Sequence, residues 1–421
     1  MPKPRPSLAI IGSGISGISA AFILDSLYDV TLIEANPTLG GHTNTVSVSD
    51  ATLGTCPIDT GFIVFNLKNY PQFTTFLRRL GVAYHASDMS FGFYDSARPF
   101  WYCSDIPWGL FSQKRHLFSP RFYQFLTHIR AFNHRVCVDL DHGRIDPSMS
   151  LNAYLNTLPF CSSLVSDYII PMGAAIWSCP IDQIYQFPAH AFFSFWQNHC
   201  LLTLKSRPLW QTIIGGSIQY IEAFKRQFSG TIRCNSPVTS VSSNQSGVTI
   251  TFADHTNLQS DKVIIATHAD QALDLLHSPT PDQRKLLSAW RYSKNTVYLH
   301  TDARVMPPSR SGWSSWLVQQ SADPTHPLHM TYYMNRLQRL DTPTDYFVTL
   351  NNSTLIDDQC LLKTIHYTHP IYDLTSLNTQ AELYKMQSDP IYFCGSYFGY
   401  GFHEDGIRSA ISIATQLGAC W

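Results

Sequence analysis

The first apolar run of the chain, residues 8–11, leads directly into a glycine-rich turn. Gly12, Gly14 and Gly17 have the spacing G-x-G-x-x-G, and a helical pattern begins at once. In a strand–turn–helix unit the first glycine permits the tight turn and the second lets a pyrophosphate approach the backbone, while the third lets the helix pack close to the strand. The helix N-terminus favours negative charge. This order predicts a dinucleotide site on Gly12, Ser13, Gly14, Ile15, Ser16 and Gly17.

An acidic residue ends the next expected strand. We predict a helix over about residues 15–28 and a strand over residues 30–33, and Glu34 follows directly. A carboxylate at this position accepts hydrogen bonds from the hydroxyls of an adenosine ribose. A second glycine pair then comes in Gly40-Gly41-His42-Thr43. Because such a pair lets another loop close over the pyrophosphate, the pattern favours a permanently held FAD over an exchanged NAD.

These segments resemble the glutathione-reductase-like flavoproteins and, within them, the FAD-dependent amine oxidase superfamily. The resemblance implies that Glu34, Ala35 and the glycine pair hold the ribose and the pyrophosphate, with His42 where many members carry Arg. Further segments resemble the family's flavin turn, adenine strand, late strand and closing motif. They contribute Gly61, Phe62, Val238, Ala266, Thr267, Gly395, Ser396, Gly406 and Ile407.

Four longer motifs resemble a bacterial subfamily more closely. They are G-G-H-T-N-T from Gly40, P-M-G-A-A-I-W-S-C-P from Pro171, A-T-H-A-D-Q-A-L from Ala266 and G-S-Y-F-G-Y-G-F-H-E-D-G from Gly395. Proteins with these motifs look similar to flavoproteins that act beside cyclopropane-type fatty-acyl methyltransferases. The resemblance implies the fold and FAD as cofactor, and it suggests a lipid methyltransferase as a partner.

The cofactor-type segments recur along nearly the whole chain of 421 residues, which is long enough for two domains. We therefore expect an α/β fold in which a Rossmann-like FAD-binding domain is interleaved with an α+β, amine-oxidase-like substrate domain. The FAD-binding domain is expected to take residues 1–70, 210–270 and 389–421. Residues 71–209 and 271–388 are expected to form the substrate domain.

Composition excludes several classes of function. The formal net charge is −1, so nothing indicates nucleic-acid binding. The first residues show no apolar signal core, and no stretch is apolar for the roughly 18 residues that span a bilayer. The 10 cysteines form no C-x-x-C pair and the 17 histidines show no metal-ligand spacing. We therefore expect reduced thiols, no metal and a cytoplasmic protein.

One segment of the chain is unusually aromatic. Between residues 91 and 132, Phe, Tyr and Trp are interspersed with basic residues. One interpretation is ordinary core and helix packing. The other is an apolar tunnel, or a face that lies on lipid with its basic residues near the head groups, namely Lys114, Arg115, Arg121, Arg130 and Arg135. The lipid-facing alternative predicts peripheral contact with the inner face of the membrane.

Three residues are candidates for a role beside the flavin, which supplies the redox chemistry. Lys294 opens an expected strand, much as the superfamily's flavin-facing lysine does; the alternative is a solvated strand end. His403 is a candidate general base, because the ordinary pKa of histidine is near neutrality. The alternative is that His403 and Glu404 only order the loop. Tyr397 belongs to an expected aromatic wall over the flavin, together with Phe398, Tyr400 and Phe402.

The leading hypothesis is an FAD-dependent oxidoreductase that removes hydride from an apolar substrate, such as a fatty-acyl chain. The first alternative is a flavin amine or amino-acid oxidase, which produces an imine and hydrogen peroxide. Further alternatives are a double-bond isomerase without net redox change and an FAD-binding partner subunit of a lipid methyltransferase. An acyl substrate requires an apolar tunnel that reaches the flavin, whereas an amino-acid substrate requires a buried Arg.

Overall fold

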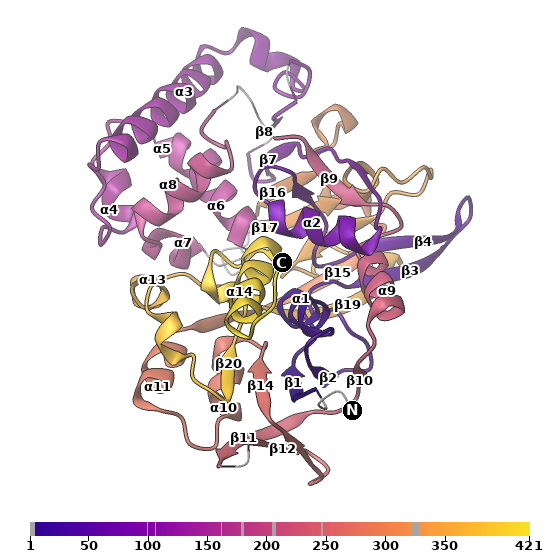
Figure 1. Cartoon of the computed structure of the whole chain (residues 1–421). Helices are drawn as coiled ribbons and strands as arrows, with labels where there is room; N and C mark the ends of the chain where they lie inside the picture. Colours follow the sequence, from indigo (N-terminus) through magenta and orange to yellow (C-terminus); the bar gives the residue numbers. More distant parts are fainter. Residues whose placement is uncertain are drawn as a thin grey trace.

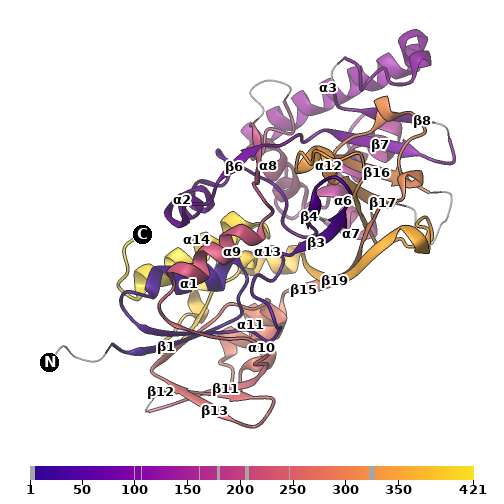
Figure 2. The same cartoon turned by 90° about the vertical axis from the view of Figure 1, so that its right-hand side faces the viewer.

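A computed structural model describes residues 5–98, 100–105, 107–160, 162–177, 181–203, 208–245, 247–321 and 328–421. In the views of Figures 1 and 2, a parallel sheet lies at the lower end of the molecule. A group of helices and a mixed sheet lie at the upper end. Among the described residues, no helix is both long enough and apolar enough to cross a membrane.

The parallel sheet contains the predicted dinucleotide-binding unit. Its strand order is β10-β2-β1-β14-β20, and in that order the strands are Thr231–Arg233, Asp29–Ile33, Ser7–Ile11, Lys262–Ile265 and Ile391–Phe393. The central strand β1 pairs in parallel with both β2 and β14. Parallel strands are covered on both faces, which explains their nearly continuous apolar sequences. The α/β fold with its Rossmann-like N-terminal unit is thus confirmed.

Four helices share one hydrophobic core with this sheet: α1 (Ile15–Leu24), α2 (Pro71–Leu80), α9 (Ile218–Gln227) and α14 (His403–Gln416). Helix α2 ends at Gly81, which adopts a left-handed φ of 72°. Helix α1 is shorter than predicted. Leu24 O accepts hydrogen bonds from both Leu27 N and Tyr28 N, and this turn brings the chain to β2.

Three small antiparallel sheets flank the parallel one. The first consists of β11 (Val238–Asn244), β12 (Gly247–Phe252) and β13 (Asn257–Ser260). The second is the hairpin of β3 (Thr45–Asp50) and β4 (Gly54–Asp59). The third joins β5 (Phe65–Asn66), β9 (Trp210–Ile213) and β6 (Tyr84–Ala86).

The mixed sheet has seven strands in the order β19-β15-β18-β17-β16-β7-β8. In that order they are Leu361–Ile371, Arg291–His300, Phe347–Leu350, Leu328–Tyr333, Trp316–Gln320, Phe91–Asp95 and Phe100–Cys103. Neighbouring strands are antiparallel except β16 and β7, which are parallel. Two strands thus come from an early segment of the chain and five from a late one.

The aromatic segment folds into β7 and β8 and then into the group of helices. This group contains a 3₁₀ turn (Lys114–Phe118), α3 (Pro120–Asp141), α4 (Leu151–Asn156), α5 (Ser162–Leu164), a π-helical turn (Val165–Ile169), α6 (Ile170–Trp177), α7 (Ile181–Gln186) and α8 (Ala189–Asn198). Phe132 of α3 and Phe193 of α8 are fully buried, with ring centroids 5.6 Å apart. Core packing therefore accounts for much of the aromatic content, although Trp108 and Phe118 are exposed.

The remaining helices are short and lie after residue 268. They are α10 (Ala269–Leu275), α11 (Pro281–Ser288), α12 (Met334–Leu337) and α13 (Leu374–Gln380). Single 3₁₀ turns occur at Ala303–Val305, Arg310–Gly312, Asp358–Cys360, Leu383–Met386 and Ser396–Phe398. The last of these turns follows β20 directly and leads into α14.

Candidate functional site

A cavity of about 1000 Å³ opens at the carboxyl ends of β1, β2 and β14. Open α/β sheets bind ligands at this edge. Most of the predicted cofactor residues line this cavity together, although they lie far apart in the sequence. They are Gly12, Ser13, Gly14, Ile15, Ser16, Glu34, Ala35, Gly40, Gly41, His42, Thr43, Gly61, Phe62, Val238, Ala266, Thr267, Gly395 and Ser396.

The first glycine turn has the geometry that a close ligand requires. Gly12 adopts a left-handed φ of 98° and donates its N–H to Ile33 O at 2.8 Å, which ties the turn to β2. A Cβ on Gly14 would meet no atom within 4 Å. The space beside Gly14 is therefore open for a pyrophosphate at the N-terminus of α1.

Glu34 connects the end of β2 to the first glycine turn. Its carboxylate accepts the N–H of Ser13 at 3.1 Å and the N–H of Asn36 at 2.9 Å. Its side chain is buried and lines the cavity. An acid fixed in this way is placed to accept the hydroxyls of a ribose.

The second glycine pair packs directly on the first turn. Gly40 donates its N–H to Ser13 O at 3.1 Å. A Cβ on Gly41 would lie 3.3 Å from Gly14 Cα, so the two loops approach each other through glycine backbone on both sides. Together they form one wall of the cavity.

Three predicted cofactor residues do not line the cavity. A Cβ on Gly17 would lie 1.9 Å from Gly12 O, so this glycine allows α1 to pack on the turn. A Cβ on Gly406 would lie 2.7 Å from Ile15 Cγ2, which identifies Gly406 as the contact between α14 and α1. Ile407 is fully buried in the same core. The structure thus gives these residues packing roles.

Lys294 also lies outside the cavity lining, and its side chain is exposed. Side chains alternate between the two faces of a strand. In β15 the next residue, Asn295, therefore points to the inner face. Asn295 is 2% exposed, and its Nδ2 lies 2.7 Å from His369 Nδ1. The structure does not place Lys294 at the cavity. Its side chain is exposed, but the residue lies within β15, paired with Thr368, and not at a strand end.

Two tyrosines that line the cavity have buried hydroxyls without a partner among the described residues. The Oη atoms of Tyr372 and Tyr397 make no hydrogen bond there. A buried polar group without a partner is costly. The open space at Gly14 and the acid at Glu34 are the features of the cavity that fit FAD.

Three histidines and a tyrosine form a cluster on the cavity wall: His42, His268, Tyr367 and His369. The ring of His42 lies 5.0 Å from that of Tyr367 and 5.2 Å from that of His369. Burial, with repulsion between the imidazoles, lowers the pKa of His42 and His268 to about 4 and that of His369 to about 3. The cluster is therefore uncharged at neutral pH. Among the described residues, no three His, Cys, Asp or Glu side chains could hold a metal ion.

His403, the first residue of α14, lines the cavity and stacks on Phe62 with 3.6 Å between the ring centroids. Its Nε2 lies 3.1 Å from Thr43 Oγ1 and 3.3 Å from Tyr220 Oη. Burial, helped by the nearby His42, lowers the pKa of His403 to about 3. A group with so low a pKa accepts protons weakly at neutral pH. The geometry therefore favours the prediction that His403 orders the site.

The two acids after His403 fix the closing loop. Glu404 accepts the N–H groups of Gln72 at 3.1 Å and Phe73 at 3.0 Å, so it caps α2. Asp405 accepts the N–H groups of Tyr400 and Phe402 at 2.9 and 3.1 Å. Burial raises the pKa of both carboxyls to about 6. These contacts hold the loop of residues 400–405 against the cavity.

Part of the cavity wall was not predicted from the sequence. Its aromatic and histidine residues outside the quoted motifs include Trp210, Trp316, Tyr332, Tyr367, His369 and Tyr372. The run H-Y-T-H-P at residues 366–370 was a usable signal, because so many ring residues are unusual in one strand. Trp210 and Trp316 gave no local signal, since only the packing of β9 and β16 brings them to the cavity. Trp177 and His268 lie in motifs that were recognised, but no role at the cavity was assigned to them.

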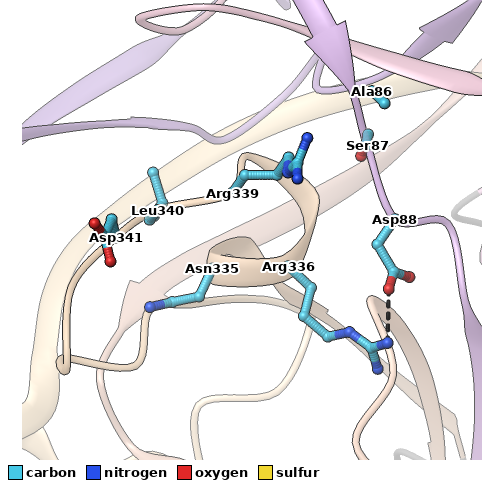
Figure 3. A pocket seen from close by; sticks show the side chains of 8 residues that line it. All are labelled: Ala86, Ser87, Asp88, Asn335, Arg336, Arg339, Leu340 and Asp341. Carbon is cyan, nitrogen blue, oxygen red and sulfur yellow. Dashed lines mark hydrogen bonds and ion pairs between the residues drawn. The ribbon is translucent and has the colours of Figure 1, made fainter.

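A second hollow, of about 580 Å³, lies elsewhere on the surface (Figure 3). It shares no residue with the cavity. Arg336 at its edge donates to Asp88 at 2.6 Å and to Asp105 at 2.7 Å, so this cation is already engaged within the chain. The cavity at the glycine turns is therefore the functional candidate.

Fold and cavity together define a class of protein: a dinucleotide-binding α/β protein whose last helix closes the cofactor site. Residues 10–80 match the NAD(P)-binding Rossmann-like domain, and residues 153–418 match the family of flavin containing amine oxidoreductases. Since the second match spans more than half of the chain, the protein belongs to the flavin containing amine oxidoreductase family. It is an FAD-dependent oxidoreductase.

Solved structures of this family have the same fold along the whole chain. Putrescine oxidase bound to putrescine is 14% identical, with a TM-score of 0.69, and the match covers 98% of this chain and 99% of that one. Cyclohexylamine oxidase from Brevibacterium oxydans IH-35A is 16% identical, with a TM-score of 0.66 and coverage of 98% and 100%. A CLA-producing fatty acid isomerase from P. acnes is 14% identical, with a TM-score of 0.65 and coverage of 98% and 99%. No curated protein sequence matches. At these identities the likeness shows the fold alone.

Proposed function

We propose that the protein removes hydride from an apolar substrate, such as a fatty-acyl chain, and transfers it to FAD. The observation that supports this proposal is that the cavity wall carries few charged side chains. The described lining residues include no Lys or Arg, and their acids are Glu34 and Asp274. Glu34 belongs to the glycine turn, and Asp274 is exposed on α10. Such a wall favours an uncharged substrate, because a buried charge needs a partner.

The lining between the mixed sheet and α6 is mainly apolar. Its residues include Ile63, Val64, Ile176, Trp177, Trp316 and Tyr332. Burial of a methylene group on such a surface contributes about 0.8 kcal/mol. This part of the cavity is therefore suited to an alkyl chain.

FAD, held by Gly14, Glu34 and Gly41, would supply a two-electron acceptor: the substrate would lose a hydride from one carbon to it and a proton from the neighbouring carbon to bulk water, and a double bond would form. The chain's own contribution is to hold the cofactor through Gly14, Glu34 and Gly41 and to exclude water from the reacting C–H bond. The hydroxyls of Tyr372 and Tyr397 are buried and make no hydrogen bond among the described residues. The uncharged histidine cluster adds no cation to the wall.

An amine or amino-acid substrate has less support. Of the expected aromatic wall, Tyr397, Tyr400 and Phe402 line the cavity and Phe398 does not. Among the described lining residues, an ammonium group would find no buried acid beyond Glu34 at the ribose position. The carboxylate of an amino acid would find no Arg among the described lining residues.

The direct test is anaerobic mixing of the FAD-loaded protein with phospholipid-bound acyl chains and, separately, with a panel of amines. We expect the acyl chains to bleach the visible absorbance of oxidised flavin and to lose two hydrogen atoms each by mass spectrometry. Bleaching by amines alone, with imine and peroxide as products in air, would refute the proposal and establish an amine oxidase.

Two other results of the same experiment would also replace the proposal. An acyl product of unchanged mass with a moved double bond would indicate isomerisation, the activity after which the P. acnes neighbour is named. If neither substrate class reacts and a lipid methyltransferase co-purifies with the protein, the flavin protein is its partner subunit.

A further inference from the structure

The most exposed apolar side chains of the described residues lie just before and at the start of α3. Phe118 is 87% exposed and Trp108 is 81% exposed, and Leu117 and Tyr123 are each 45% exposed. We call these four residues the apolar tip. Large apolar side chains that gather on a surface mark a contact with another molecule or with a membrane.

The segment that bears the apolar tip is folded. Phe111 N donates to Pro107 O at 3.3 Å, and Tyr123 Oη donates to Leu117 O at 3.2 Å. Ser119 caps α3 by accepting the N–H of Phe122. The tip residues are therefore held outward by an ordered scaffold. In Figures 1 and 2, α3 lies at the edge of the molecule, away from β1 and β2.

The same segment is strongly basic. Residues 106–138 contain five Lys or Arg and no Asp or Glu, whereas the whole chain has a net charge of −1. Lys114, Arg115 and Arg121, which are next to the apolar tip in sequence, are exposed. The acid just before the segment, Asp105, is paired with Arg336, which also pairs with Asp88. The positive charge around the tip is thus not balanced within the segment.

We propose that the apolar tip binds an anionic lipid surface. Trp108, Leu117 and Phe118 enter the head-group layer, and Lys114, Arg115 and Arg121 contact the lipid phosphates. This combination of exposed aromatic side chains with Lys and Arg, in a segment whose sequence contains no acid, is the signature of peripheral membrane attachment. A protein partner of mixed charge would not require a segment free of acids. The inference is independent of the proposed substrate.

The test is sedimentation of the FAD-loaded full-length protein with vesicles of phosphatidylcholine alone or mixed with phosphatidylglycerol. We expect binding to the mixed vesicles at low salt and weaker binding as salt rises. The variants W108S/F118S and K114E/R115E should each lower the partition coefficient by about tenfold or more. Flavin absorbance and thermal unfolding verify that the variants are folded.

Control variants change other exposed residues elsewhere on the surface. L209S/Y384S replaces two apolar side chains that are each 66% exposed, and R284E/K363E reverses two exposed cations on α11 and β19. Both controls should bind vesicles like the unchanged protein. Equal binding to neutral and anionic vesicles, loss of binding in the controls, or no binding at low salt would overturn the proposal. The last result would leave the tip as a contact for a protein.

Discussion

At the residue scale, the glycines of the first turn divide into two kinds. A Cβ on Gly17 would collide with Gly12 O, so Gly17 serves the packing of α1. Gly14 has φ of −66°, which any residue adopts, and free space beside it. The motif in the sequence contains both kinds and does not distinguish them, because only the folded chain shows which glycine faces the ligand.

The first prediction follows from this difference. G14V should fold normally and bind FAD more weakly by about 1–3 kcal/mol, the usual cost of overfilling a packed site. G17A should instead lower the thermal stability of the protein itself, since the new methyl group meets backbone. The flavin-to-protein absorbance ratio and thermal unfolding measure the two effects. Full FAD content in G14V would contradict the proposed position of the pyrophosphate.

The second prediction concerns the unpartnered hydroxyl of Tyr397. Y397F should leave the FAD-free protein at least as stable as before and should alter the flavin spectrum or its rate of dissociation. The matched variant Y220F removes a hydroxyl that is hydrogen-bonded to Thr43 and His403, and it should cost about 1–2 kcal/mol. Thermal unfolding with and without FAD separates the outcomes. Equal destabilisation of the FAD-free proteins would show that Tyr397 has a partner within the chain.

At the element scale, the first βαβ unit was predictable because its signals are local. The apolar strand, the glycine turn and the acid at the end of β2 follow one another in the sequence. Lys294 was misplaced because the faces of β15 are set by its pairing with β18 and β19, which are distant in sequence. A shift of one residue in a strand exchanges the inner and outer faces. The capping role of Glu404 could not be predicted from the sequence either, because α2, whose N–H groups it accepts, lies more than 300 residues earlier.

The third prediction tests this contact between elements. E404A removes the acceptor of two N–H groups at the start of α2 and should destabilise the protein by about 1–3 kcal/mol. Glu382, which is paired with Lys285 and Lys385 on the surface, provides the control. E382A should change stability by less than about 1 kcal/mol. Chemical denaturation measures both variants, and similar values for the two would refute the capping role.

At the scale of the whole molecule, burial sets the response to pH. His42, His268, His369 and His403 have pKa values of about 3 to 4 in the folded protein, against 6.5 for an unburied histidine. Below pH 6.5 the unfolded chain therefore binds more protons than the folded protein, and acid favours unfolding. Asp59, Glu404 and Asp405 act in the opposite direction, because their pKa values rise to about 6. The histidine shifts are larger and more numerous.

The fourth prediction is that the melting temperature falls as the pH decreases from 6.5 towards 4. H369Q removes one of the buried imidazoles and can still accept the hydrogen bond from Asn295. This variant should show a shallower decrease over the same pH range. Calorimetry at several pH values measures both slopes. A melting temperature that is constant or rises on acidification would contradict the burial of neutral histidines.

The origin of the cavity wall has a consequence for how the protein is made. Its lining begins at Ile11 and ends at His403, so the first and last parts of the chain must both be present before the cavity exists. A ribosome has to synthesise almost the entire polypeptide before the pocket can close. FAD must therefore bind late in maturation. The yellow colour of bound flavin then indicates a chain whose synthesis and folding are complete. Incomplete or nicked chains that lack the segment from Gly395 onward would be colourless and open to degradation.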